Sequence, residues 1–368
     1  MRIAFDYQIF VRQMYGGVSR YAYELAVELA TACGQEVAVI SPLYINRYLA
    51  NARPELKVIG VPVPRLPKTG RIYHAISSLL SWPAIRYFHP DIVHETYYSA
   101  RRMAPKSAKV VLTVYDMIHE KFNKHFSLDD PTSREKILAV GRADHIICIS
   151  EQTRQDLIEM MGVDPAKTSV VHLGFTLTSQ SDLAQKAEKP ARPFLLYVGN
   201  RGGHKNFDGL VKAYAASTQL RNDFDLVCFG GGRYTSNEKD LFQRNGLSLE
   251  CVRQVSGDDA TLTGYYKVAS AFVYPSLYEG FGIPPLEAMN FNCPVVCSNV
   301  SSIPEVVGNA AEMFNPNDPE SIRMAIERVM GGETLRATLI TRGQERIKHF
   351  SWERCAQETL DVYRRVLL

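Results

Sequence analysis

Residues 274–289 read YPSLYEGFGIPPLEAM, and this stretch indicates a strand that passes through a glycine loop into a helix. The apolar run Ala271–Tyr274 is a strand candidate, and Gly280 and Gly282 mark the loop that follows it. Pro284 and Pro285 suit the first positions of a helix. Strand, loop and helix in this order are the beginning of a βαβ unit.

Two carboxylates lie in the same stretch. Glu279 stands in the loop, and Glu287, eight positions later, is expected in the first turn of the helix. The backbone N–H groups at a helix start are free to receive an anion. A sugar diphosphate needs such donors, together with carboxylates for sugar and ribose hydroxyls. Considered alone, Glu279 also fits a solvated loop residue, and Glu287 a residue that complements the helix dipole.

The same rhythm of short β-branched runs and helical patterns extends outward over the whole chain. Several of the runs are apolar on both faces, which is typical of strands in a parallel sheet covered by helices. The strand candidates are Ile3–Phe5, Glu36–Ile40, Lys57–Val61, Asp91–His94, Lys109–Val114, His145–Ile149, Ser169–His172, Phe194–Val198, Asp225–Phe229, Ala271–Tyr274, Pro294–Cys297 and Ala311–Phe314. The sequence therefore predicts an α/β fold.

A polar segment, Thr176–Pro193, separates two series of strands and is interpreted as a linker. We place one domain at residues 1–175 and a second at 190–350. Residues 351–368 form a separate helix with Ser351 as its N-cap. Its candidate buried positions are Trp352, Cys355, Leu360, Tyr363 and Leu367.

The composition agrees with two ordinary globular domains. The chain has 368 residues, of which 46% are hydrophobic and 22% charged, and its net charge of +3 argues against a dedicated nucleic-acid binder. No stretch approaches the roughly 18 apolar residues of a membrane span, and the N-terminal apolar run is too short for a signal peptide. The seven scattered cysteines favour reduced core thiols over disulfides or a metal site. We therefore predict a cytoplasmic protein.

The order E-G-F-G-x-P-x-L-E-A, with seven residues between the two glutamates, resembles the motif of retaining GT-B glycosyltransferases of the bacterial "glycosyl transferases group 1" family. This resemblance implies two Rossmann-like domains that face each other across a cleft, with the C-terminal helix crossing back to the first domain. It also implies that the first domain binds an acceptor. The second would bind a nucleoside diphosphate sugar, from which a hexose is transferred with retention.

The resemblance assigns donor-binding residues to four glycine-containing turns. Residues 197–206, YVGNRGGHKN, contain Gly199 and two cations, Arg201 and Lys205, which would contact the donor diphosphate; the alternative is two solvated basic residues. Residues 14–20, MYGGVSR, would close over the phosphates, with Ser19 as the cap of the next helix. The donor-binding glycines and their aromatic neighbour are Gly16, Gly17, Gly199, Gly230, Gly280, Phe281 and Gly282.

The first domain departs from the family at one position. Residues 109–122, KVVLTVYDMIHEKF, resemble a T-x-H-D stretch, but Tyr115 stands where the family has His. Asp116 matches, and His119 follows three residues later, so either Tyr115 or His119 would contact the donor sugar. Ser150 resembles a donor-contacting residue, although N-capping also explains it.

We expect no metal cofactor. The sequence D-F-D at Asp223–Asp225 matches the D-x-D motif of metal-dependent glycosyltransferases, but it enters a strand candidate and that motif belongs to another fold. Catalysis would rest on Arg201, Lys205, the Gly16–Gly17 amides and a helix N-terminus, which stabilise the leaving diphosphate. Two alternatives remain open: a nucleotide-sugar epimerase or hydrolase of the same fold, and a non-catalytic sugar-nucleotide binder.

Likeness to bacterial mannosyltransferases of surface-polysaccharide and lipopolysaccharide synthesis favours GDP-mannose as donor and a lipid-linked saccharide as acceptor. Between Pro64 and Lys109 the sequence also combines many cations with an apolar, aromatic run that includes Ile72, Leu79 and Trp82. This combination suits peripheral contact with an anionic membrane at the cytoplasmic face. The alternative is a core-packed helix with ordinary exposed cations.

Overall fold

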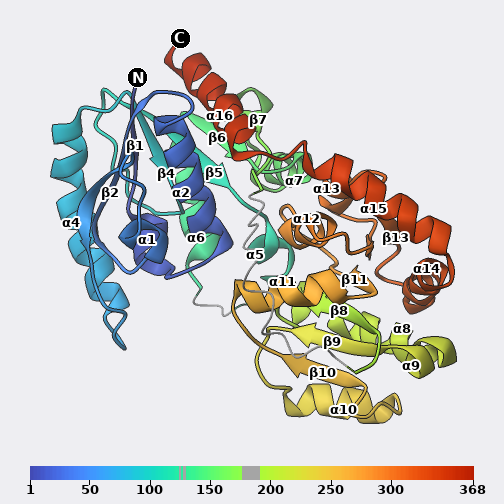
Figure 1. The fold of residues 1–368 in the computed structure, drawn as a ribbon. Helices are drawn as coiled ribbons and strands as arrows, with labels where there is room; N and C mark the ends of the chain where they lie inside the picture. Colours follow the sequence, from blue (N-terminus) through green and yellow to red (C-terminus); the bar gives the residue numbers. More distant parts are fainter. Residues whose placement is uncertain (124–125, 127–129, 176–190) are drawn as a thin grey trace. The chain divides into compact units, whose positions relative to one another are not determined.

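A computed structural model describes residues 1–123, 126, 130–175 and 191–368. Within these limits the chain forms two compact units (Figure 1). Unit 1 consists of Met1–Gly174 together with Phe350–Leu368, and unit 2 of Phe175–His349. Most of the expected linker, residues 176–190, lies outside the described residues.

Unit 1 is built on a parallel sheet of seven strands in the order β3-β2-β1-β4-β5-β6-β7. The strands are β1 (Arg2–Phe5), β2 (Glu36–Tyr44), β3 (Lys57–Pro62), β4 (Ile92–Glu95), β5 (Lys109–Val114), β6 (His145–Cys148) and β7 (Thr168–Val170). The helices are α1 (Gln8–Arg12), α2 (Gly17–Ala30), α3 (Arg47–Ala50), α4 (Gly70–Phe88), α5 (Ile118–Lys121), α6 (Thr132–Arg142), α7 (Glu151–Met161), the 3₁₀ turn η2 (Pro165–Lys167) and α16 (Trp352–Leu367).

Unit 2 contains a second parallel sheet, with six strands in the order β10-β9-β8-β11-β12-β13. Its strands are β8 (Phe194–Val198), β9 (Asp225–Phe229), β10 (Val252–Val255), β11 (Ala271–Tyr274), β12 (Val295–Ser298) and β13 (Glu312–Phe314). Its helices are η4 (Gly203–Lys205), α8 (Phe207–Ala216), α9 (Thr218–Asp223), α10 (Ser236–Arg244), α11 (Asp259–Val268), α12 (Ile283–Asn290), α13 (Ile303–Val307), α14 (Pro319–Gly331) and α15 (Glu333–Ile347).

All twelve strand candidates correspond to strands, with ends that differ by a few residues. The expected α/β fold with two Rossmann-like sheets is confirmed. The sequence analysis missed β10, an edge strand that pairs only with β9 among the described strands. Only Val252 of this strand is fully buried, so the strand lacks the apolar pattern that marks its neighbours.

Helix α16 completes unit 1 although it follows unit 2 in the chain. Ser351 caps it, accepting a hydrogen bond from the Arg354 amide at 3.1 Å. Its apolar face packs on α2, and the Tyr363 hydroxyl bonds His94 Nδ1 in the core. Four of the five expected positions are buried, whereas Leu367, 41% exposed, is a wrong prediction. This residue lies in the last turn, beyond the reach of α2 and the sheet.

No helix among the described residues has the length and apolar character required to cross a membrane. All seven cysteines are free thiols, five of them buried. Burial raises the pKa of Cys148 and of Cys355 to about 12, which keeps both thiols protonated at neutral pH.

The topology of unit 2 gathers the expected donor residues at one edge. Strand β8 lies between β9 and β11, and the three run parallel, so the loops that follow them leave the sheet at the same side. Those loops carry Gly199–Lys205, Gly230–Gly232 and Pro275–Gly282. The carboxyl edge of a parallel sheet is where α/β folds bind ligands.

Candidate functional site

A charged pair joins two of these loops. Lys205 Nζ lies 2.7 Å from Glu279 Oε1, although 74 residues separate the two in sequence. Lys205 belongs to η4, and Glu279 to the β11–α12 loop. The Lys205 ammonium also lies 5.7 Å from the ring centroid of Tyr274, the last residue of β11. The structure therefore brings two of the predicted catalytic residues into direct contact.

The Glu279 loop is fixed by two serines that the sequence analysis did not single out. Ser301 Oγ and Ser302 Oγ donate to the Glu279 carbonyl at 2.7 and 2.9 Å, and Ser302 Oγ also reaches the Phe281 carbonyl at 2.8 Å. Both serines follow β12, the neighbour of β11. Their position just after a strand candidate, at the same edge of the sheet as Glu279, is the sequence signal that could have identified them.

Tyr274 adds a phenol beside Glu279. Burial first, and then the negative charge of Glu279, holds the pKa of Tyr274 well above its usual value. The phenol therefore stays protonated and can donate a hydrogen bond to the carboxylate. Glu279 thus has two neighbours that can donate to its carboxylate, the Lys205 ammonium and the Tyr274 hydroxyl.

Helix α12 begins directly after this loop. Gly282 is its N-cap with a φ of +116°, a conformation that suits glycine, and no side chain caps the helix. Glu287 is the fifth residue of the helix, so its expected place in the first turn is wrong: Ile283, one residue earlier than the prolines, begins the helix. Tyr266 donates to Glu287 Oε2 at 3.2 Å.

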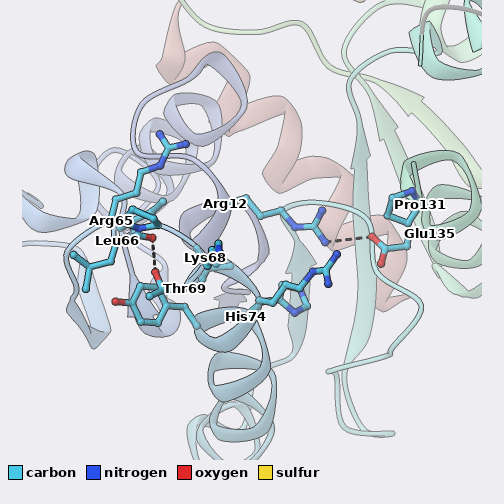
Figure 2. Close-up of a pocket in the computed structure, with 14 residues that line it drawn as sticks. Arg12, Arg65, Leu66, Lys68, Thr69, His74, Pro131 and Glu135 are labelled. Carbon is cyan, nitrogen blue, oxygen red and sulfur yellow. Dashed lines mark hydrogen bonds and ion pairs between the residues drawn. The ribbon is translucent and has the colours of Figure 1, made fainter. Parts of the chain in front are cut away.

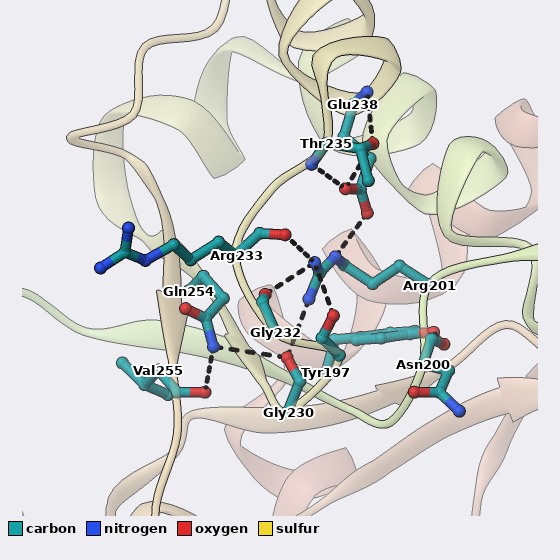
Figure 3. Close-up of polar contacts among 11 residues, drawn as sticks. Tyr197, Asn200, Arg201, Gly230, Gly232, Arg233, Thr235, Glu238, Gln254 and Val255 are labelled. Carbon is teal, nitrogen blue, oxygen red and sulfur yellow. Dashed lines mark hydrogen bonds and ion pairs between the residues drawn. The ribbon is translucent and has the colours of Figure 1, made fainter. Parts of the chain in front are cut away.

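Arg201 is oriented into unit 2 (Figure 3). Its Nε lies 2.5 Å from Glu238 Oε1, Nη1 donates to the Gly230 carbonyl at 2.8 Å, and Nη2 to the Gly232 carbonyl at 2.8 Å. The side chain is almost fully buried. Glu238 meanwhile closes the capping box of α10 through Thr235.

Arg201 therefore ties the glycine turn after β9 to the start of α10. Gly230, Gly231 and Gly232 have φ values of +87°, +69° and +71°, and a Cβ on Gly231 would overlap the Arg201 guanidinium. This conformation turns three carbonyls toward one side chain. The structure thus shows a positioning role for Arg201, and its direct contact with a diphosphate stays a prediction.

The glycine pair of unit 1 lies at the start of α2. Gly16 is the N-cap and Gly17 the first helical residue. The expected cap, Ser19, is wrong, because Gln13 Oε1 accepts from the Ser19 amide at 3.2 Å and takes that role from outside the helix. A Cβ on Gly16 would overlap the Gln13 side chain, whereas Gly17 has open space.

The remaining unit 1 residues follow β5 and β6 in the chain, with His119 in α5. The Tyr115 hydroxyl donates to the Thr96 carbonyl at 3.0 Å in the core. Asp116 Oδ1 accepts from the Ile118 amide at 3.0 Å. His119 stacks on Phe126 with ring centroids 4.0 Å apart. Ser150 caps α7, so its capping role is confirmed and its donor contact stays a prediction. Of the two candidates at the departure from the family motif, only His119 has a partly exposed side chain.

The D-x-D stretch does not offer a free pair of carboxylates. Asp223 ends α9, and the buried Asp225 carboxylate lies 3.1 Å from both Arg192 and Arg253. Among the described residues, no group of three or more His, Cys, Asp or Glu side chains is placed to hold a metal ion.

Comparisons with known proteins cover almost the whole chain. Residues 179–346 match the family described as "Glycosyl transferases group 1", and residues 15–179 match "Glycosyltransferase Family 4". The O-antigen chain mannosyltransferase B of Escherichia coli is 28% identical over 95% of this chain and 96% of its own length. The O-antigen chain mannosyltransferase RfbU of Salmonella typhimurium is 26% identical over 83% of this chain and 86% of its own length.

Solved structures share the fold. Sucrose-phosphate synthase from Thermosynechococcus elongatus has a TM-score of 0.75 at 21% identity, covering 99% of this chain and 98% of that one. Anabaena Alr3699/HepE, in complex with UDP-glucose, has a TM-score of 0.69 at 16% identity and covers 98% and 100%. The two parallel sheets and the two adjoining family matches lead to one conclusion: the chain is a glycosyltransferase in which residues 15–179 belong to Glycosyltransferase Family 4 and residues 179–346 to glycosyl transferases group 1.

Proposed function

We propose that this glycosyltransferase moves mannose from GDP-mannose to a saccharide acceptor, with retention, in the synthesis of surface polysaccharide or lipopolysaccharide. The observation that carries the proposal is the similarity to the E. coli O-antigen chain mannosyltransferase B over 95% of this chain. The Salmonella relative RfbU is also named as an O-antigen chain mannosyltransferase.

The chemistry at the carboxyl edge of unit 2 supports a diphosphate donor. Lys205 supplies positive charge, and the Gly282 and Ile283 amides at the start of α12 supply N–H donors for the leaving diphosphate, since Pro284 and Pro285 have none. Glu279 would bind hydroxyls of the transferred sugar and Glu287 those of the ribose. When the donor binds, Lys205 exchanges part of its contact with Glu279 for phosphate, which frees carboxylate oxygens for sugar hydroxyls.

The donor is tested by thermal unfolding with GDP, UDP and ADP at equal concentrations. A nucleotide at 100 times its dissociation constant stabilises the protein by about 2.7 kcal/mol. The proposal expects the largest shift with GDP. A larger shift with UDP, the nucleotide in the named HepE complex, would replace the guanosine assignment.

The reaction is tested with labelled GDP-mannose and an extract of lipid-linked saccharides. Acceptor-dependent transfer, with an anomeric configuration equal to that of the donor by NMR of the product, is the expected result. Donor consumption that is the same without acceptor would favour a hydrolase or epimerase. Donor binding without consumption would favour a non-catalytic binder.

The reaction is also proposed to need no metal ion, because Lys205 and helix amides already neutralise the diphosphate. Full activity in excess EDTA is the expected result. Loss of activity in EDTA that Mg²⁺ or Mn²⁺ restores would contradict the proposal and return attention to Asp223 and Asp225.

We also propose that α4 contacts an anionic membrane, because this helix exposes several large apolar side chains. The side toward β2 buries small serines, and Ser77 Oγ donates to the Leu43 carbonyl at 3.1 Å, where β2 has an irregular register. The opposite side exposes large apolar residues, with Leu79 75% and Tyr87 86% exposed. Exposed apolar surface beside cations is what an anionic lipid surface binds.

Flotation with liposomes tests this contact. Wild-type protein is expected to bind vesicles that contain phosphatidylglycerol, and raised salt should weaken binding. Leu79→Ser with Trp82→Ser should reduce binding, while Leu249→Ser, which removes an exposed leucine of unit 2, serves as the control. Absence of binding to anionic vesicles at low salt would remove the membrane from the proposal.

A further inference from the structure

Unit 1 contains a cavity of about 710 Å³ that none of the predicted donor or catalytic residues line (Figure 2). Its walls come from α1, from the loop between β3 and α4 with the start of α4, and from the start of α6. The volume lies within the range of small-molecule sites. The cavity therefore has room for a sugar ring and its substituents.

The lining of the cavity is strongly cationic. Four basic side chains, Arg12, Arg65, Lys68 and Arg71, line it, against Glu135 as the one lining carboxylate. Arg12 pairs with Glu135 at 3.2 Å. In the part of the chain that the structure describes, no carboxylate pairs with any of the other three cations. Three uncompensated positive charges at one cavity favour an anionic ligand.

The loop that carries two of these cations has an uncommon backbone. Lys68 has a φ of +64°, in the left-handed region that long side chains rarely adopt. The turn is closed by Thr69 Oγ1, which donates to the Leu66 carbonyl at 2.8 Å. Glycine would fit this position without strain, so a lysine held there at a cost points to a use for its charge.

His74 also lines the cavity. Its Nε2 is buried and forms no hydrogen bond, and its ring lies edge-on to Tyr7 at 5.3 Å. Burial, and then the positive charge of Arg12, lowers the pKa of His74. A bound anion would offset the positive charge of Arg12 beside this ring.

Most of the remaining lining is apolar and includes Val11, Ile45 and Tyr73, on which a sugar ring can pack. We propose that this cavity binds the phosphate of a phosphorylated saccharide acceptor, with Arg65, Lys68 and Arg71 on the phosphate and the apolar wall on the sugar. This inference rests on the proposed function for the role of acceptor. The phosphate can belong to a lipid-linked saccharide or to a soluble sugar phosphate.

Direct binding is measured by calorimetry with mannose 1-phosphate, in saturating GDP so that the nucleotide site is occupied. The test variant is Lys68→Gln/Arg71→Gln. The control, Lys167→Gln/Arg365→Gln, removes the same charge from exposed positions of unit 1 outside the cavity. We expect the test variant to bind at least tenfold more weakly than wild type and the control to be unchanged. Equal affinity in both variants would overturn the proposal, provided that both unfold like wild type.

A second measurement separates this proposal from the proposed function. Transfer to a phosphate-linked acceptor should show a raised KM in the test variant, while transfer to the same saccharide without phosphate should not change. Equal KM effects on both acceptors would contradict a phosphate subsite. Because the calorimetry needs no turnover, an enzyme that transfers no mannose would refute the proposed function and leave the binding result standing.

The source of the phosphate is decided by comparing acceptors. Arg71 lines the cavity and Ile72, the next residue of α4, is exposed, so the exposed apolar side of α4 begins at the mouth. A farnesyl diphosphate-linked saccharide that binds more tightly than mannose 1-phosphate, with the gain lost in Leu79→Ser, assigns the phosphate to a lipid. Equal affinities assign it to a soluble sugar phosphate.

Discussion

At the scale of single residues, the ion pair joins Lys205, the proposed diphosphate ligand, to Glu279, the proposed ligand of the transferred sugar. We predict that Lys205→Ala lowers GDP affinity roughly ten- to a hundredfold, because charge-assisted contacts contribute about 1.5–3 kcal/mol. Calorimetry with GDP measures this. The control is Lys239→Ala, which removes an exposed lysine of unit 2. Wild-type affinity in Lys205→Ala would exclude contact between Lys205 and the diphosphate.

Substitutions of the two glutamates of the same motif, Glu279 and Glu287, are expected to affect different steps. Glu279→Gln should lower kcat more than nucleotide affinity, because its proposed partners are hydroxyls of the transferred sugar. Glu287→Gln should lower GDP affinity and leave kcat at saturation closer to wild type. Steady-state kinetics and GDP titration of each variant test this pattern, and unchanged values in both variants would contradict the paired-carboxylate interpretation.

Substitution of Arg201 is expected to lower the stability of unit 2. Arg201→Ala removes the partner of Glu238 and of the glycine-turn carbonyls, so unit 2 should lose about 3 kcal/mol of unfolding free energy. Denaturant unfolding measures the loss. If Arg201→Ala is as stable as wild type and only binds donor poorly, the guanidinium contacts the donor as the family motif suggests.

At the scale of elements, α16 is attached to unit 1 through a histidine that is neutral in the folded protein. Burial lowers the pKa of His94 to about 3, while its nitrogens bond Tyr363 and Thr113. Between pH 3 and about 6.5 the unfolded chain therefore binds more protons. This contribution to stability is complete above about pH 6.5 and falls as the pH drops.

The expected loss at pH 5 is about 2 kcal/mol relative to pH 7.5, at up to about 1.4 kcal/mol per pH unit. Because other groups also titrate, the measurement compares urea unfolding of wild type and His94→Gln at both pH values. The variant should lose about 2 kcal/mol less on acidification. The same pH dependence in both proteins would show that His94 titrates normally.

Elements were easier to predict than contacts. The strands were recognisable because parallel strands buried on both faces are continuous apolar runs, whereas β10 carries Arg253 and Gln254 at a sheet edge. The motif residues Lys205 and Glu279 could be named from sequence. The partner of Arg201 could not be named, since Glu238 is 37 residues away in the sequence. Three-dimensional partners of this kind have no local signal.

At the scale of the whole molecule, the two tryptophans offer a matched comparison. Trp352 is 8% exposed and packs near Gly174 and Tyr21, while Trp82 is 47% exposed on α4. Trp352→Ala should destabilise unit 1 by about 3–5 kcal/mol, and Trp82→Ala by much less. Denaturant unfolding of wild type and of both variants tests this. Equal losses would contradict the packing of α16 as described.

The return of the chain to unit 1 has a consequence for synthesis on the ribosome. The chain emerges from its N-terminus, so all of unit 2 is made before Phe350–Leu368. Until then the apolar surface of α2 that receives α16, and the buried His94 that bonds Tyr363, lack their cover. Unit 2 can therefore complete its folding before unit 1 does, although residues 1–174 of unit 1 are synthesised first. During that interval the nascent protein exposes this apolar surface, to which chaperones can bind.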